Sequence, residues 1–350
     1  MIDDMTPKER LQAISENRLY DRIPHGFALG EVAARLTGIK VSEFHLDAKK
    51  QIEASVAAYR HYGLDAVGAF IMVQEIIGSD VVYPDQSTPI IRRPLSLDDE
   101  KLQHLHLDDP KNHPKLQVFW QVLEGLLAEV GDEAPIAVGI EGPFSTLGRA
   151  VGTSPLLISL IRKDPEYVHH LLENVLNVEI AIVNSLEGYG VAFGIFDPVA
   201  SGTLIKAEQY RTFAKPYQKR LFDAMTRVSG QKPQCHMCGN TSKILRDIVE
   251  TGAGMVSVDN MMDLSYVKQV LGKDAVLVGN VSPTDTMLLG TPKDVENDLR
   301  GCLKKAWDAP GGYIPSFGCA LPIDTPPENI DALFNALRRY GKYPLNPDLF

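Results

Sequence analysis

Two cysteines and a histidine lie within seven residues, QCHMCGN at 234–240, in a chain that has only 4 cysteines. Such side chains could bind a metal, form a redox pair, supply a reactive thiol or simply fill a buried strand. On an extended strand alternate side chains share a face, so His236 and Cys238 project together while Cys235 and Met237 project to the other side. This parity makes His236 and Cys238 candidate ligands and predicts that Cys235 is a small buried hydrophobic residue.

A zinc site needs at least a third ligand from the protein, and Cys319 in SFGCALPIDTPPEN is the candidate. With His236 and Cys238 it would form the Cys₂His set of a catalytic zinc, which leaves one position open for a substrate. Cys302 lies inside the helical run VENDLRGCLKKAWD and is predicted to be structural. The spacing of Cys235 and Cys238 also matches a redox motif, but that motif normally opens a helix, whereas this segment is a predicted strand.

Eight short apolar runs alternate with helical patterns along the chain, which is typical of βα units around a parallel sheet. Eight units in series favour an α/β fold with a closed (β/α)8 TIM barrel over an open doubly wound sheet. Residues 1–350 are then one domain with an N-terminal helical extension over 1–20, and 81–84 and 90–93 form a small hairpin. The eight runs are IPHGFAL (23–29), DAVGAF (65–70), IAVGIEGPF (136–144), VAFGIFDP (191–198), QCHMCGN (234–240), MVSVDN (255–260), AVLVGNV (275–281) and YIPSFGC (313–319).

In such barrels the chemistry takes place at the carboxyl ends of the strands, where further polar residues collect. Ordinary roles compete for them, since a rim carboxylate is often solvated and Asp or Asn often caps a helix. The expected roles are catalysis for Glu75 and Asp197, substrate binding for Ser201, Asn240 and Asn280, and orientation of the His236 ring for Glu141.

Composition limits the partners. The chain is 44% hydrophobic and 23% charged, and no apolar run approaches the roughly 20 residues that span a bilayer. A formal net charge of -10 without a Lys/Arg cluster argues against nucleic-acid binding. The N-terminus lacks the pattern of a secretory signal, so we expect a cytoplasmic protein whose thiols stay reduced. Small molecules or proteins are the expected partners, and a homodimer is left open.

Longer stretches resemble a known family. GIEGPFSTLGRAVGT, FDPVASGTLIKAEQYRTFAKPYQKRL, CHMCGNTSKILRDIVETGAGMVSVDN and GCALPIDTPPENIDAL are similar to the uroporphyrinogen decarboxylase superfamily. Within it, the chain resembles the corrinoid-dependent zinc methyltransferases, typified by methylcobamide:coenzyme M methyltransferase. That branch holds zinc with His-x-Cys and a distant Cys, which His236, Cys238 and Cys319 match. The resemblance implies transfer of a methyl group between cobalamin, carried by a corrinoid-binding partner protein, and a thiol or methylated small molecule, with zinc activating the thiol.

Three alternatives accompany this hypothesis. A corrinoid-linked O-demethylase would act on a methyl ether, but such relatives are expected to hold zinc with two carboxylates and a histidine, and no such spacing ends at His236. A uroporphyrinogen decarboxylase would open with an Arg-rich, Gly-containing motif, which residues 21–33 do not resemble. A sensor or scaffold that kept the zinc site is the alternative outside enzymes.

Overall fold

The computed structural model describes residues 3–25 and 29–350. Its centre is a sheet of seven strands in the order β1-β4-β5-β6-β7-β8-β9, and every neighbouring pair in it is parallel. A separate antiparallel pair is formed by β2 and β3. The strands are β1 (Val67–Ile71), β2 (Asp80–Val82), β3 (Ile90–Arg93), β4 (Ile136–Glu141), β5 (Ala192–Phe196), β6 (Gln234–Met237), β7 (Met255–Val258), β8 (Val276–Val278) and β9 (Tyr313–Ile314).

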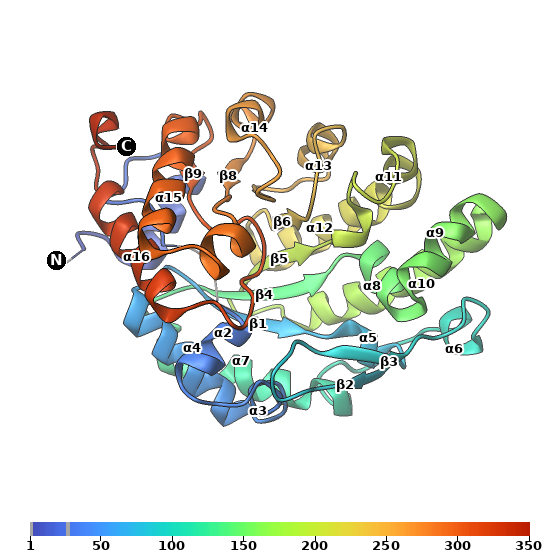
Figure 1. Ribbon diagram of the computed structural model, residues 1–350. Helices are drawn as coiled ribbons and strands as arrows, with labels where there is room; N and C mark the ends of the chain where they lie inside the picture. The colour runs from blue at the N-terminus through green and yellow to red at the C-terminus, as the bar shows by residue number, and fades with distance from the viewer. Residues whose placement is uncertain (1–2, 26–28) are drawn as a thin grey trace.

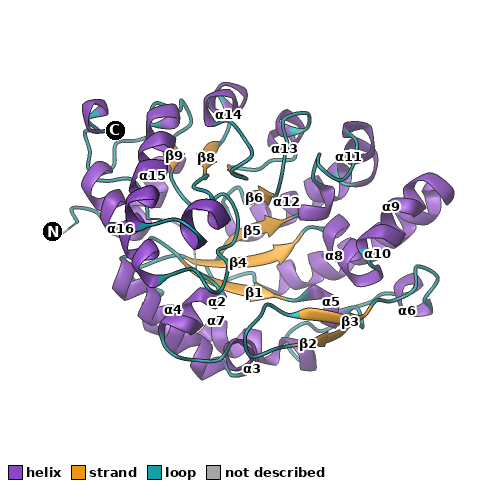
Figure 2. Cartoon of the chain, in the orientation of Figure 1, coloured by secondary structure: helices purple, strands orange, loops and turns teal. Residues whose placement is uncertain are grey.

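Helices follow the parallel strands and surround the curved sheet on its outer side (Figures 1 and 2). The α-helices are α1 (Pro7–Ser15), α2 (Glu31–Leu36), α3 (Val41–Leu46), α4 (Ala48–Tyr62), α5 (Val73–Ile76), α6 (Glu100–Gln103), α7 (Gln117–Val130), α8 (Pro143–Val151), α9 (Thr153–Arg162), α10 (Pro165–Ser185), α11 (Ala207–Phe213), α12 (Lys215–Ser229), α13 (Leu245–Glu250), α14 (Leu264–Leu271), α15 (Pro292–Ala306) and α16 (Pro327–Tyr340). Short helical turns are η1 (Pro114–Leu116), η2 (Pro198–Ala200), η3 (Pro283–Leu288) and η4 (Pro347–Leu349).

Successive side chains of a strand point to opposite faces of the sheet, so its residues divide between an outer face that meets the helices and an inner face. Residues such as Ile195 and Val256 join the large core between the sheet and the helices. On the inner face of β8 and β9 a second, smaller cluster forms, in which Val276, Val278 and Ile314 pack against Ile14 of α1. The inner face is therefore filled beside β8 and β9, at the end of the sheet that α1 covers.

The N-terminal helix is held by its cap and by a buried ion cluster. Thr6 and Glu9 form a capping box at the start of α1. Arg10 is fully buried, donates hydrogen bonds to Asp21 at 2.7 Å and also pairs with the buried Asp65 just before β1. Arg22 binds the second oxygen of Asp65 at 2.8 Å. These ion pairs connect the N-terminal segment to the start of the first strand of the sheet.

The described structure confirms seven of the eight expected strands in order, together with the expected hairpin. The remaining expected strand is the first in the chain, 23–29. Of its residues, 26–28 lie outside the described part of the chain, and 23–25 and 29 are not in a strand. What the structure shows is thus a seven-stranded parallel sheet with surrounding helices rather than a closed barrel of eight strands.

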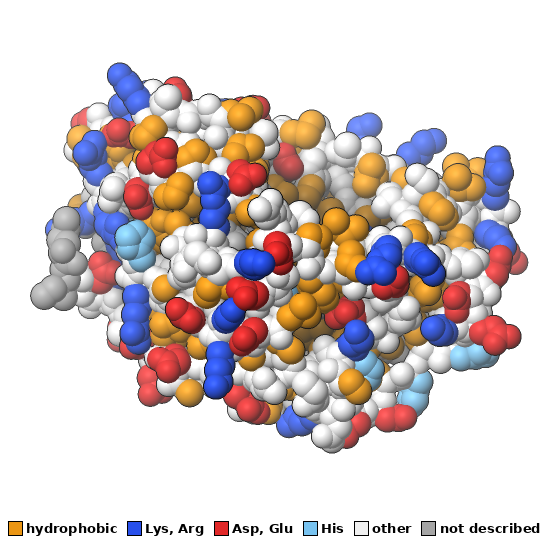
Figure 3. All heavy atoms as spheres, turned by 60° about the horizontal axis from the view of Figure 1, so that its bottom comes forward, with side chains coloured by type: hydrophobic (Ala, Val, Ile, Leu, Met, Phe, Trp, Pro, Cys, Tyr) orange, Lys and Arg blue, Asp and Glu red, His pale blue; other side chains and the backbone are white. Residues whose placement is uncertain are grey.

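The surface carries charges of both signs. On the face that Figure 3 presents, basic and acidic side chains are interspersed, and no continuous basic area covers it. Among the described residues no single helix is long and apolar enough to cross a bilayer; α8 and α9, bent by 107° at their junction, would reach that length and composition only as a pair.

Arg10→Met should lower the free energy of unfolding by about 3 kcal/mol or more, because it leaves the carboxylate of Asp65 buried with one cation fewer. Urea denaturation followed by circular dichroism measures the change. Arg18→Met is the matched control, since the ion pair of Arg18 with Glu16 is about half exposed and its loss should cost less than about 1 kcal/mol. Equal effects of the two substitutions would contradict the assigned role of Arg10.

Candidate metal centre

The first two candidate ligands lie at the carboxyl end of β6. His236 is buried within the strand, and Cys238 is the first residue after its end. Cys235 and Met237 are each 1% exposed and belong to the large outer core. The parity argument is confirmed, since His236 and Cys238 share the inner face while Cys235 packs toward the helices.

A tight turn follows Cys238 and is fixed from two sides. Gly239 has a φ of 73°, and a Cβ there would lie 2.3 Å from Oγ1 of Thr203, so only glycine fits. Ser201 donates a hydrogen bond to the carbonyl of Cys238 at 2.5 Å. The carboxylate of Asp259 accepts the backbone N–H of Gly239 at 2.8 Å. Ser201, expected to contact substrate, instead holds the backbone of a candidate ligand.

Cys319 reaches this turn from the far side of β7 and β8. After β9 the chain continues beside β8, where the N–H of Gly318 donates to the carbonyl of Val281 at 2.8 Å. It then passes against the segment that follows β7, so closely that a Cβ on Gly318 would lie 2.5 Å from the backbone nitrogen of Asn260. A side chain at 318 would force the two backbones apart, and Cys319 would move with them.

Three ligand atoms converge at this point. Sγ of Cys238 lies 3.4 Å from Nε2 of His236 and 3.4 Å from Sγ of Cys319, and all three atoms lie within 4.8 Å of one another. A tetrahedral zinc with ordinary bond lengths would separate two sulfurs by roughly 3.8 Å and a nitrogen from a sulfur by roughly 3.6 Å. One zinc ion therefore fits between the three atoms with small shifts. In the described part of the chain no other such cluster of His, Cys, Asp or Glu forms.

A serine, not a glutamate, contacts the second nitrogen of the histidine ring. Nδ1 of His236 lies 3.0 Å from Oγ of Ser257, which is its register partner on β7. This corrects the expectation that Glu141 orients the ring. The carboxylate of Glu141 instead accepts a hydrogen bond from Gln74 at 2.5 Å and pairs with Arg149. Ser257 leaves Nε2 directed at the two sulfurs, which is the arrangement a metal-binding imidazole needs.

The two thiols titrate as a pair. The hydrogen bond from the Cys238 thiol, with a smaller contribution from His236, lowers the pKa of Cys319. The same hydrogen bond, together with burial, raises the pKa of Cys238. The pair therefore accepts one negative charge readily, and a bound cation would favour the loss of the second proton.

The two residues expected to be catalytic have structural partners. Glu75 accepts a hydrogen bond from the Tyr83 hydroxyl at 2.7 Å and pairs with Lys115 at 3.3 Å. Asp197 is fully buried and accepts hydrogen bonds from the backbone N–H of Ser145 at 3.0 Å and from Gln218 at 2.5 Å. Burial raises the pKa of Asp197 to about 6. Asp197 thus caps α8, and neither residue joins the three ligand atoms.

The two asparagines also have other partners. Asn240 is exposed, and its side-chain oxygen accepts the N–H and the hydroxyl of Ser242, as in a capping turn. Asn280 is buried and donates to the carbonyls of Asp259 and Met262 at 3.0 and 2.7 Å. Its amide nitrogen is therefore bound to the backbone, whereas the expected role was substrate binding. Cys302, whose Sγ lies 3.6 Å from Oδ1 of Asn280, is buried in α15 as expected.

Sequence reasoning assigned no positioning role to four residues that hold the site: Ser257, Asp259, Thr203 and Gly318. Alternation in MVSVDN places Ser257 on one face of its strand, but only the pairing of β6 with β7 shows that it lies opposite His236. The contacts of Gly318 and Thr203 join segments far apart in the chain, and no local pattern signals them.

Comparison with known proteins assigns the chain to a family. The pattern of the family described as Uroporphyrinogen decarboxylase (URO-D) matches residues 6–340. The chain belongs to this family. The methylated-thiol–coenzyme M methyltransferase of Methanosarcina mazei is 26% identical over 97% of the chain and 90% of that protein. The methylcobamide:CoM methyltransferase MtbA of the same organism is 28% identical over 96% of the chain and 99% of that protein.

A solved methyltransferase from Methanosarcina mazei has the same fold, with a TM-score of 0.83 at 23% identity, and the match covers 96% of this chain and 99% of that one. The named sequence relatives confirm the likeness to the methyltransferase branch of the family. The expected class of enzyme, a methyltransferase, is the class to which these relatives belong.

Ser257→Ala should weaken zinc affinity about 10- to 100-fold, because the imidazole loses the partner that fixes its orientation. A competition titration with a chromophoric chelator measures the affinity. Glu141→Gln serves as the control and should leave it unchanged, since Glu141 contacts Gln74 and Arg149 rather than the ring. A loss with Glu141→Gln but not with Ser257→Ala would reverse the assignment.

Gly318→Val should lower the zinc content well below one ion per chain while the protein stays folded, because the added side chain cannot fit against Asn260. Metal analysis after dialysis and far-ultraviolet circular dichroism provide the two measurements. Gly301→Ala in α15 is the control, since a Cβ there has no atom within 4 Å. Full zinc content in Gly318→Val would show that the close approach does not position Cys319.

Proposed function

We propose that this protein is a zinc-dependent methyltransferase that moves a methyl group between a corrinoid on a partner protein and a thiol or methylated small molecule. The observation that carries the proposal is the convergence of His236, Cys238 and Cys319 at 3.4 Å spacings. Two sulfurs and one imidazole nitrogen form the donor set of catalytic zinc sites that keep one position open. Relatives named methylcobamide:CoM methyltransferases match the chain over almost its whole length, which supports the corrinoid partner.

Each residue of the site has a separate role in this proposal. His236 would hold zinc through Nε2, and Cys238 and Cys319 through their sulfurs. When bound, zinc lowers the pKa of a substrate thiol, so that the sulfur is present as a nucleophilic thiolate. Two cysteine ligands leave the centre with little net positive charge, which preserves the nucleophilicity of that sulfur. Ser257 fixes the ring of His236, and Ser201 and Asp259 hold the turn that carries Cys238.

In the direction of thiol methylation, the thiolate sulfur forms a bond to the methyl carbon. The cobalt–carbon bond of the partner's corrinoid breaks, both electrons stay with cobalt, and the thiol proton passes to solvent. The products are a methyl thioether and a cobalt(I) corrinoid. The donor set favours this chemistry over ether demethylation, for which two carboxylates and a histidine were expected. Among the described residues, the carboxylates of Glu75, Glu141 and Asp197 are engaged away from the three ligand atoms.

We further propose that the fold is a (β/α)8 barrel and that residues 1–350 form one domain. The backbone hydrogen bond from the N–H of Asp65, just before β1, to the carbonyl of His25 at 3.2 Å supports this proposal, because it joins the chain at His25 to the start of the first strand of the sheet. We also place the enzyme in the cytoplasm, since its four cysteines are free and the ligand pair must stay reduced.

Cys319→Ala should reduce the zinc content well below one ion per chain, because it removes one of three ligands. Cys235→Ala should leave the content unchanged, since Cys235 lies in the outer core. Metal analysis of the purified variants, with circular dichroism to confirm folding, makes the comparison. Equal zinc loss from both variants would contradict the assignment of ligands.

The activity itself is tested with methylcobalamin and a panel of thiols, by following the change of the corrinoid spectrum as the methyl group leaves. Zinc-loaded protein should consume methylcobalamin in the presence of a suitable thiol, and Cys319→Ala should not. If the zinc-loaded protein gives no turnover with any thiol in the panel, and none with any methyl donor in the reverse direction, the sensor or scaffold alternative is favoured.

A further inference from the structure

An aromatic ring lies beside the metal centre on the inner face of the sheet. Phe196 is the register partner of His236, so the two side chains point to the same face. Their ring centroids are 6.4 Å apart. Phe196 is only partly buried although it lies on a strand in the middle of the sheet. An apolar surface therefore begins next to the zinc ligand and is open to a small molecule.

A second aromatic ring extends this surface. Phe70 of β1 lies with its ring centroid 5.9 Å from that of Phe196. The two rings meet above Gly139 of β4, where a Cβ would come within 2.5 Å of Phe70 and 2.9 Å of Phe196. Glycine at 139 is thus what allows both rings to lie along the inner face.

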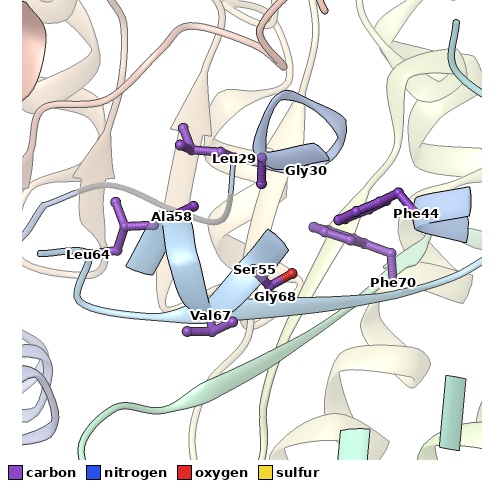
Figure 4. A pocket seen from close by; sticks show the side chains of 10 residues that line it. Leu29, Gly30, Phe44, Ser55, Ala58, Leu64, Val67, Gly68 and Phe70 are labelled. Atoms are coloured by element: carbon purple, nitrogen blue, oxygen red, sulfur yellow. The ribbon is translucent and has the colours of Figure 1, made fainter. Parts of the chain in front are cut away.

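Phe70 is unusual because it is accessible to solvent although it lies on the inner face of the sheet. Its side chain is 38% exposed, whereas the other residues of β1 are buried. It also borders a narrow apolar pocket with Phe44 and Leu29, and Figure 4 shows these side chains among those that line it. By contrast, the inner face at β8 and β9 is filled by the cluster around Ile14. The open part of the inner face therefore lies on the side of the two aromatic rings.

We propose that Phe70 and Phe196 form an apolar subsite for the hydrocarbon part of the thiol substrate. This inference rests on the proposed function, and it specifies the substrate class as an uncharged alkyl or aryl thiol and its methyl thioether. The sulfur lies at the three ligand atoms, and the carbon chain extends from there along the ring of Phe196 to Phe70. The rings themselves offer no charged partner to a sulfonate or carboxylate at that end of the substrate. Glu141 is the register partner of Phe196 on β4, but its carboxylate is already paired with Arg149 and bound by Gln74.

Isothermal titration of the zinc-loaded protein with ethanethiol, propanethiol and butanethiol tests the subsite without requiring turnover. Each added methylene should tighten the dissociation constant by roughly fourfold, the gain expected for one buried CH₂ group. The anionic thiol 2-mercaptoethanesulfonate should bind more weakly than propanethiol. Metal-free protein should bind each thiol much more weakly, since the sulfur has lost its partner.

Two variants locate the subsite. Phe70→Ala should weaken butanethiol binding roughly three- to tenfold, the range for one aromatic contact, and should change ethanethiol binding less than twofold. Gly139→Ala should abolish the dependence on chain length, because the added methyl group displaces both rings. Ile161→Ala removes an apolar side chain that is 80% exposed on α9 and should change no affinity.

The outcomes separate this inference from the proposed function. If 2-mercaptoethanesulfonate binds more tightly than propanethiol, or if chain length and Phe70→Ala have no effect, the apolar subsite is wrong while thiol binding stands. If no thiol binds to the zinc-loaded protein, the proposed function itself is wrong. A fourfold gain per methylene that Phe70→Ala reduces, Gly139→Ala abolishes and Ile161→Ala preserves supports the subsite.

Discussion

The site depends on one close approach between backbones. Cys319 follows a strand three places away from the strand that carries His236, and the chain after β9 must pass over the end of β7 to bring its sulfur to Cys238. It does so with Gly318 in van der Waals contact with the backbone of Asn260, where no side chain fits. Without this approach the chain would contain a His-x-Cys pair and a distant thiol, and neither would hold a metal alone.

Around this contact, hydrogen bonds fix the orientation of the candidate ligands His236 and Cys238. Ser257 sets the ring of His236, while Ser201 and Asp259 hold the turn at Cys238 and Gly239. The acidic residues near the strand ends serve mainly the scaffold, since Asp197 caps α8 and Glu141 pairs with Arg149. The inner face therefore presents a sulfur-rich centre beside the aromatic rings of Phe70 and Phe196, a combination suited to a thiol with a hydrocarbon chain.

Local patterns predicted the features that depend on neighbouring residues. Alternation of apolar runs and helical patterns located seven parallel strands, and the predicted N-terminal helical extension contains α1. The rim residues Glu75, Asn240 and Asn280 were placed correctly near strand ends, but their partners were not foreseen. A side chain at a strand end has several neighbours within reach, and the choice among them depends on packing that spacing does not encode.

The sequence by itself determined which side chains are candidate ligands and the separation of Cys235 from Cys238, because the alternation of side chains along a strand is a local property of the backbone. It also determined the family, through motifs spread along the chain. Only the tertiary structure decided that Ser257 rather than Glu141 orients His236, since strand register is set by pairing between segments. Likewise, only the folded chain shows that Phe70 and Phe196 meet over Gly139, because three separate strands must come together before that surface exists.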